Sequence, residues 1–246
     1  MYGFLKLSAP ERRLACLQVE DQMRLPAASV EKDFWICWTL RELFALPEIG
    51  PHLTFKGGTS LSKAWKLIER FSEDIDLIVD KHTLGFAGDA SPDHAPSKKQ
   101  RKLRLEALME ACRQWVQQTL QPALAARISA ALGQTGWKLE VDPDMDDGQC
   151  LLFQYPGAFA ATEAGYVRPV VKIELGARSG SCLPLTRLTL GAKIMRKCAA
   201  KCSSVKCPHL TKLFVSLVTS KNASTSRHEV GEFKNNIVTK CQHEPF

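Results

Sequence analysis

The chain has 246 residues, 45% of them hydrophobic, which is enough for one large or two small domains with a substantial core. No stretch approaches the roughly 18 consecutive apolar residues of a membrane span, and residues 1–10 show no signal-peptide pattern, so we expect a cytoplasmic protein without a membrane anchor. The net charge of +7 comes from residues 182–246, which hold eleven Lys and Arg against three Asp and Glu, whereas residues 1–181 have a net charge of −1. The basic balance therefore gives no support for nucleic-acid binding by the first 181 residues.

Two helices are predicted over residues 10–46. Pro10 opens the first, Pro26 separates the two, and Pro47 ends the second. The second is predicted to begin at Ser29, and its first turn holds the charged residues 31–33. These charges either cap the helix or line a nucleotide cleft, and the sequence leaves both interpretations open.

A glycine turn follows a short strand predicted at residues 53–55. Gly57 and Gly58 lie between this strand and a helix predicted from Thr59 to Arg70. Backbone N–H groups at the start of a helix bind phosphate, and glycine lets the backbone come close to it. A plain strand-to-helix turn is the alternative interpretation of a Gly-Gly pair. No Gly-Lys-Ser/Thr follows four residues after a glycine, so the chain is not a P-loop NTPase.

The next strand carries two carboxylates at its start, Asp74 and Asp76, and is predicted to continue over residues 75–79. Side chains at alternate positions of a strand point to the same face, so Asp74 and Asp76 converge while Ile75 and Leu77 face a core. An Asp-x-Asp pair alone is common on solvated edges. Two oxygen ligands on one strand beside a phosphate-binding turn are what a Mg²⁺-dependent enzyme of nucleoside triphosphates requires.

The middle of the chain is predicted to contain a loop, a long helix and a hairpin. Residues 81–100 are polar and rich in Gly and Pro, which indicates a mobile loop, and Ser97 is placed to cap a helix that runs to about Leu132. Strands are predicted at 137–141 and 150–155. The acidic stretch between them lacks EF-hand spacing, so we predict a solvated hairpin turn rather than a Ca²⁺ loop.

A last strand is predicted at residues 168–175. Its alternating apolar residues share one face, and Lys172 and Glu174 share the other. A single Glu in such a strand is usually an edge residue or an ion-pair partner. Here Glu174 offers the third carboxylate that a two-metal site with Asp74 and Asp76 requires.

Residues 182–246 form an atypical basic tail that holds five of the nine cysteines. We predict a tail of different origin, from a frameshifted or truncated gene end, that is disordered or poorly packed. The other four cysteines are widely spaced, so we expect them to be reduced and buried. Zinc binding stays open because the spacing of the four candidate ligands matches no standard structural site. These ligands are Cys198, Cys202, Cys207 and His209.

Four segments resemble the AbiEii/AbiGii family of nucleotidyltransferase toxins, within the DNA polymerase β-like superfamily. They are residues 31–35, 56–63, 70–77 and 172–178. The resemblance covers about residues 25–180, and the paired glycine and Asp-x-Asp motifs make it specific.

This resemblance implies an α+β nucleotidyltransferase fold, a small mixed β-sheet flanked by helices. We expect an N-terminal helical segment at 1–50, a nucleotidyltransferase core at 51–181 and the atypical tail at 182–246. The implied activity is Mg²⁺-dependent transfer of a nucleoside monophosphate from an NTP, with tRNA or another RNA as acceptor. The implied setting is a toxin–antitoxin or abortive-infection system with a cognate antitoxin protein.

The resemblance also implies roles for individual residues. The catalytic and metal-binding set is Asp74, Asp76 and Glu174, with Lys172 as a catalytic cation. The nucleotide-binding set is Gly57, Gly58, Thr59, Ser60 and Lys63. Arg70 is a further candidate to neutralise charge on the phosphates.

Two alternatives remain at this point. In the first alternative, the acceptor is a protein side chain or a small molecule instead of RNA. Otherwise the chain is a truncated, non-catalytic remnant that binds only NTP or the antitoxin, because the tail lacks the further Lys and Asp motif expected of the family.

Overall fold

The computed structural model describes residues 2–60, 73–160 and 167–177. The predicted helix beyond Ser60, with Lys63 and Arg70, lies outside the described residues. The tail and its candidate zinc ligands Cys198, Cys202, Cys207 and His209 also lie outside them.

The N-terminal region is helical, as predicted. It consists of α1 (Tyr2–Leu5), α2 (Ala9–Met23) and α3 (Ala27–Phe44). Glu11 in the first turn of α2 accepts a hydrogen bond from the backbone N–H of Ser8 at 2.8 Å, which satisfies a free donor at the helix start. Pro26 is the N-cap of α3, so this helix begins two residues before the predicted start at Ser29.

Five strands form one mixed sheet in the order β1-β2-β5-β4-β3. The central pair, β2 and β5, is parallel, and the other neighbours are antiparallel. This arrangement confirms the predicted mixed sheet flanked by helices. The strands are β1 (Leu53–Lys56), β2 (Asp74–Val79), β3 (Lys138–Val141), β4 (Cys150–Gln154) and β5 (Val170–Gly176).

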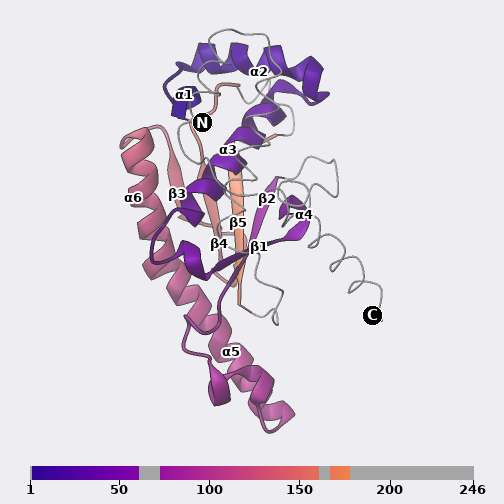
Figure 1. The fold of residues 1–246 in the computed structure, drawn as a ribbon, viewed down its shortest axis with the longest axis vertical. Coiled ribbons are helices and arrows are strands. Elements are labelled where there is room, and N and C mark those ends of the chain that lie inside the picture. The colour runs from indigo at the N-terminus through magenta and orange to yellow at the C-terminus, as the bar shows by residue number, and fades with distance from the viewer. Residues whose placement is uncertain (1, 61–72, 161–166, 178–246) are drawn as a thin grey trace, which may run out of the picture.

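One face of the sheet is covered by α3 and by a long helical rod (Figure 1). The rod runs through α5 (Lys98–Trp115), a π-helical turn at Val116–Leu120 and α6 (Gln121–Leu132). Trp35 and Trp38 of α3 are completely buried, and they share one hydrophobic core with the apolar faces of β2, β4, β5 and the rod. The Ser97 cap is confirmed, because its hydroxyl accepts a hydrogen bond from the Gln100 N–H at 3.2 Å.

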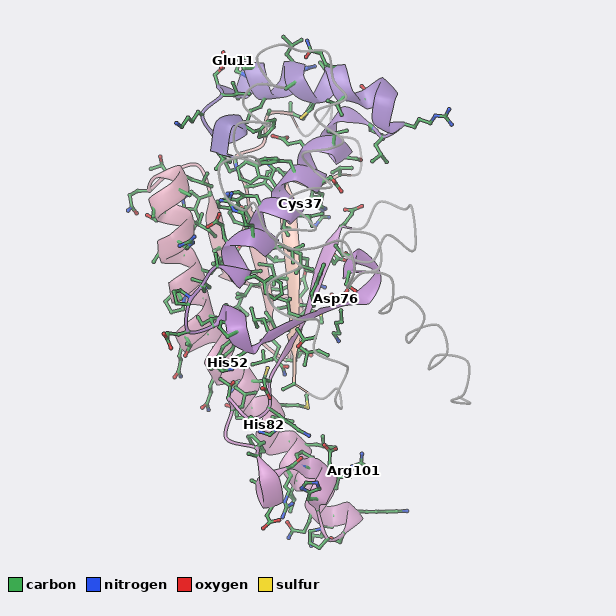
Figure 2. The ribbon with its side chains drawn as sticks, viewed as in Figure 1. Glu11, Cys37, His52, Asp76, His82 and Arg101 are labelled. Carbon is green, nitrogen blue, oxygen red and sulfur yellow. The ribbon has the colours of Figure 1, made fainter. Side chains whose placement is uncertain are left out.

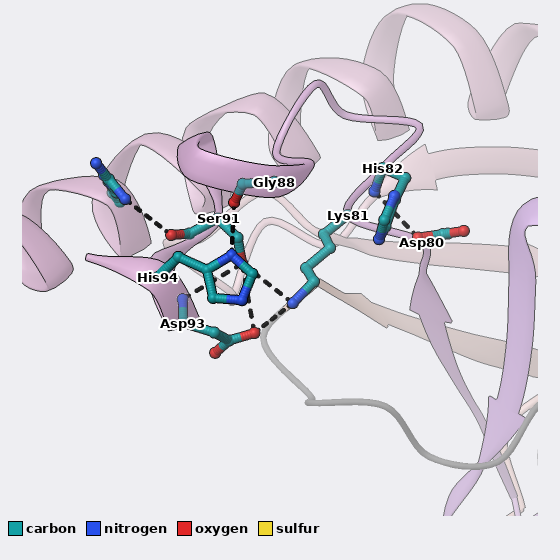
Figure 3. A network of polar contacts seen from close by, with 8 residues as sticks. Asp80, Lys81, His82, Gly88, Ser91, Asp93 and His94 are labelled. Atoms are coloured by element: carbon teal, nitrogen blue, oxygen red, sulfur yellow. Dashed lines mark hydrogen bonds and ion pairs between the residues drawn. The ribbon is translucent and has the colours of Figure 1, made fainter. Parts of the chain in front are cut away.

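The segment between β2 and α5 contains two short 3₁₀ helices, Gly88–Ala90 and Pro92–His94. The ammonium group of Lys81 binds Asp93 and donates to the Ser91 hydroxyl at 3.2 Å, which ties the end of β2 to this segment (Figure 3). The segment thus has local structure, and its mobility stays a prediction.

The β3–β4 connection is a hairpin, as predicted, and the Asp142 N–H donates to the Cys150 carbonyl at 2.9 Å. The four described cysteines are reduced and buried, also as predicted. No helix in the described part of the chain combines the length and apolar character needed to cross a membrane.

Candidate active site

The predicted site carboxylates lie side by side on the two central strands. Asp76 of β2 is the direct partner of Glu174 in β5, and Asp74 is the partner of Lys172. Their neighbours Ile75 and Ile173 are fully buried in the core, so the four charged side chains project from the opposite face of the sheet. We call this face, defined by Asp74, Asp76, Lys172 and Glu174, the site face. Figure 2 shows Asp76 on β2 near the middle of the molecule.

Negative charge accumulates on the site face. Partial burial is the main cause that raises the pKa of Asp74, and repulsion from Glu174 adds to it. The pKa of Asp76 is raised by the same two causes in the same order. Two carboxyl groups whose charged forms are disfavoured in this way gain from a nearby cation.

Lys172 already supplies one positive charge at this site. Its ammonium nitrogen lies 3.0 Å from Glu174 Oε1 and 3.8 Å from Asp142 Oδ2. The hydrogen bond to Glu174 is the main cause that raises the pKa of Lys172, so its charged form is favoured. Asp142 is buried, with 6% of its surface exposed. The sequence placed Asp142 in a solvated turn and gave no sign of this contact.

The glycine turn lies directly against Asp76. Lys56, the last residue of β1, is the partner of Asp76 in the sheet, and Gly57 follows it with φ of +73°. A Cβ atom on Gly57 would lie 1.8 Å from Asp76 Oδ2. Only glycine therefore fits here, both for its backbone conformation and for the space that the carboxylate occupies. The turn and the carboxylate pair, separated in sequence, form one site.

The hydroxyl groups after the glycines hold the turn in place. Helix α4 (Gly57–Ser60) begins at the turn, and Thr59 and Ser60 are both buried. The Thr59 hydroxyl donates to the backbone carbonyl of Asp74, and the Ser60 hydroxyl donates to the Gly57 carbonyl at 2.9 Å. The Thr59 bond ties the turn to β2, and the Ser60 bond closes the turn on itself. That the backbone of residues 57–60 binds phosphate stays a prediction.

Two further cations border the site. The sequence left a cleft-lining role open for the charged residues 31–33, which include Lys32, and assigned no role to Lys56. Burial keeps the pKa of Asp74 and Asp76 raised, but the charge of Lys32 partly offsets the rise at Asp74, and that of exposed Lys56 partly offsets it at Asp76. Lys32 is 5% exposed and its ammonium nitrogen lies 2.5 Å from Glu73 Oε2. Neighbouring Glu31 instead accepts the Ala158 N–H at 2.9 Å, which anchors the segment after β4 to α3. Only the strand register and the packing of α3 bring these residues near the carboxylates.

The donor set suits a hard divalent cation. Carboxylate oxygens are the ligands that Mg²⁺ prefers, and Asp74, Asp76 and Glu174 share one face. Within residues 2–60, 73–160 and 167–177, no three His, Cys, Asp or Glu side chains are gathered closely enough to form a finished metal site. A cation at Glu174 competes with the Lys172 ammonium group. The residues fit Mg²⁺ in their chemistry and share one face of the sheet, and Mg²⁺ binding stays a prediction.

A mixed sheet that carries Asp-x-Asp beside a glycine turn defines a protein of the nucleotidyltransferase class. Residues 38–218 match the family described as nucleotidyl transferase AbiEii toxin, type IV TA system. This match covers well over half of the chain, so the chain belongs to the AbiEii family. Membership implies a nucleotide substrate and an antitoxin partner. No curated protein and no solved structure matches the chain.

The matched region begins and ends later than the sequence motifs indicated. It starts at Trp38, after the segment 31–35. It continues to residue 218, so the similarity to the family extends past residue 182, where we expected it to end. The first part of the tail is therefore shared with the family.

Proposed function

We propose that the chain is a toxin that transfers a nucleoside monophosphate from an NTP to a hydroxyl group of RNA, with tRNA as the leading acceptor. One observation carries the proposal. The Gly57 turn packs against Asp76, and Asp76 pairs across the sheet with Glu174. This brings a candidate phosphate-binding backbone and three carboxylates into one site.

The reaction forms a bond between the acceptor hydroxyl oxygen and the α-phosphorus of the NTP. The bond from that phosphorus to the bridging oxygen breaks, and pyrophosphate leaves. Asp74, Asp76 and Glu174 would hold Mg²⁺, which supplies charge neutralisation and a lower pKa for the acceptor hydroxyl. Glu174 would accept the hydroxyl proton. Lys172, which contacts Glu174 and Asp142, would balance negative charge on the phosphates.

The test is nucleotide transfer by the purified chain. Each of the four NTPs, labelled at the α-phosphate, is incubated with Mg²⁺ and total tRNA. We expect label in a product that nuclease destroys and protease does not. Label in a protease-sensitive product would replace RNA with a protein acceptor. No labelled product with any of the four NTPs, from a folded chain, would contradict the proposal.

Asp76→Asn is the matching variant. It removes the charge with little change in shape, and we expect transfer to fall by at least about 100-fold, since metal-ion stabilisation of this kind amounts to several kcal/mol. Asp80→Asn is the control, because Asp80 follows the end of β2, outside the four residues that define the site face, and its carboxylate accepts the His82 N–H at 3.0 Å. Equal loss in both variants would indicate damage to β2 instead of a catalytic role.

A further inference from the structure

The amino-terminal end of α5 is a basic surface that the proposed chemistry does not use. Its exposed side chains Lys98, Lys99, Arg101 and Lys102 lie within five consecutive positions, and we call them the basic tip. The first buried residue of α5 is Leu108. At about 1.5 Å per residue, the helix therefore extends roughly 15 Å from its start before it enters the core. Figure 2 shows Arg101 near the end of the molecule, Asp76 near its middle and His82 between the two.

The charges of the basic tip are placed against local helix energetics. Cations in the first turn of a helix face its positive dipole end, and like charges three or four residues apart repel each other. Lys98 lies in the first turn of α5, three residues before Arg101 and four residues before Lys102, so its charge is repelled by both. This arrangement of charges does not stabilise the helix. Such departures from local stability rules are typical of functional sites.

Few acidic groups offset these charges. Among the described residues, the ion pair recorded for the basic tip joins Lys102 to Glu106 at 3.8 Å, between side chains 80% and 58% exposed. Such an exposed pair is weak. Arg101 lies near Asp93, but that carboxylate is bound by Lys81. Three of the four cations are thus available to a ligand at no cost in lost ion pairs.

The basic tip is also firmly joined to the strand that bears the carboxylates. Arg104 donates to the Ser91 carbonyl at 3.0 Å, and Lys81, just after β2, binds Ser91 and Asp93 (Figure 3). A ligand held by the basic tip is thus connected, through these contacts, to the strand that bears Asp74 and Asp76. It must be long enough to extend from the end of α5 toward the centre of the molecule, which a nucleic-acid helix is and a small molecule is not.

We propose that the basic tip binds the phosphate backbone of the RNA acceptor and positions its reactive end toward the site face. This inference rests on the proposed function in taking RNA as the acceptor. Phosphate contacts by Lys and Arg position a nucleic acid without reading its sequence. The specificity of the enzyme for its acceptor would then lie in shape and length.

The test is direct binding of a fluorescent RNA hairpin with a single-stranded 3′ end, in the absence of NTP. Binding by the full chain is compared with that of a variant carrying Lys98→Gln, Lys99→Gln, Arg101→Gln and Lys102→Gln. Gln keeps the helix propensity of these positions. We expect at least about tenfold weaker binding at 0.1 M salt, and a slope of log affinity against log salt that is smaller by about 3.

The matched control removes four exposed basic side chains on other elements, through Lys6→Gln, Arg24→Gln, Lys138→Gln and Arg168→Gln. It has the same net charge, and its affinity and slope should stay near those of the unmodified chain. If both variants lose affinity equally, the effect is one of net charge and the proposal is overturned. Unchanged RNA binding by the tip variant would also overturn the proposal. The basic tip would then be expected to bind an acidic protein surface instead.

Failure of the proposed function is distinguishable from failure of this inference. The binding assay contains no NTP, so it gives its result even if the chain transfers no nucleotide. If transfer does occur, the tip variant should raise KM for RNA by about the factor lost in affinity, with kcat unchanged. A lower kcat at saturating RNA would place the tip in folding or chemistry and contradict a binding role.

Discussion

The site face and the basic tip are both rich in charge, but their charges are paired differently. On the site face, Lys172 contacts Glu174 and Asp142, and nearby Lys32 contacts Glu73. On the basic tip, the recorded ion pair within the described residues is the long one between Lys102 and Glu106. Paired charges are held in a fixed arrangement, which chemistry requires, whereas unpaired charges are available to a polyanion. The near-neutral total for residues 1–181 conceals this separation.

The site face depends most strongly on the contact between Gly57 and Asp76. Gly57→Ala places a Cβ atom where Asp76 Oδ2 lies, so the carboxylate must turn away. We expect nucleotide transfer to fall by at least about 100-fold, as for loss of the carboxylate itself. The left-handed backbone at Gly57 also costs about 1 kcal/mol with Ala, measurable by chemical unfolding.

Gly85→Ala separates these two effects. Gly85 has φ of +85°, and a Cβ atom added there meets nothing within 4 Å. The variant should lose about 1 kcal/mol of stability through its backbone and keep full transfer activity. Equal activity loss in the Gly57 and Gly85 variants would show that reduced stability, and not the contact with Asp76, explains the effect.

Asp142 tests whether nucleotide transfer requires the Lys172 ammonium group to be held by a second carboxylate besides Glu174. Asp142→Asn keeps an oxygen that can accept the Asp144 N–H, but it removes the negative charge that faces Lys172. We expect about a tenfold loss in kcat, in the range for a supporting residue that acts through a charged neighbour, with the NTP affinity little changed. Asp144→Asn in the same turn is the control, since Asp144 is exposed. Full activity of Asp142→Asn would show that Glu174 alone positions Lys172.

Asp142 also shows where prediction from sequence ends. The alternation of Asp74 with Asp76 and the Ser97 cap follow from local rules, and the structure places both as predicted. Asp142 reaches Lys172 only because the β3–β4 hairpin pairs with β5. Such contacts depend on register between distant strands, which a single sequence does not specify.

The N-terminal helices show the same limit. The predicted helices were found, because the spacing of prolines is a local signal. The different uses of neighbouring Glu31 and Lys32 were not predictable, because they depend on which face of α3 meets the sheet. Glu31 turns to Ala158 and Lys32 to Glu73. The resemblance to the family identified the site, whereas the packing around it came from the structure.

Glu31 tests how much a buried carboxylate reduces stability when a backbone N–H group, that of Ala158, is its hydrogen-bond donor. Burial is the main cause that raises its pKa above the ordinary 4.5. The folded state then keeps the proton to higher pH than the unfolded state, so the free energy of unfolding falls as pH rises from about 4.5 through the raised pKa. We expect Glu31→Gln to lack this fall. In the unmodified chain, the free energy of unfolding should fall by up to about 1.4 kcal/mol for each unit of pKa shift. Urea unfolding of both proteins between pH 4 and pH 7 measures the difference, and parallel curves would contradict it.

The smallest expected effect concerns Glu106, the acidic side chain that pairs with Lys102 of the basic tip. Glu106→Gln removes the partner of Lys102 and leaves that cation fully available. Because an exposed pair of this kind contributes at most about 1 kcal/mol, we expect RNA to bind about twofold more tightly, with a slightly steeper salt dependence. Glu110→Gln, one turn further along α5, is the control, because Glu110 is bound to Arg113 at 2.6 Å and lies beyond the tip. If affinity rises equally in both variants, RNA responds to the overall field of α5. If it rises only with Glu106→Gln, the contact is confined to the first turns of the helix, where the unpaired charges lie.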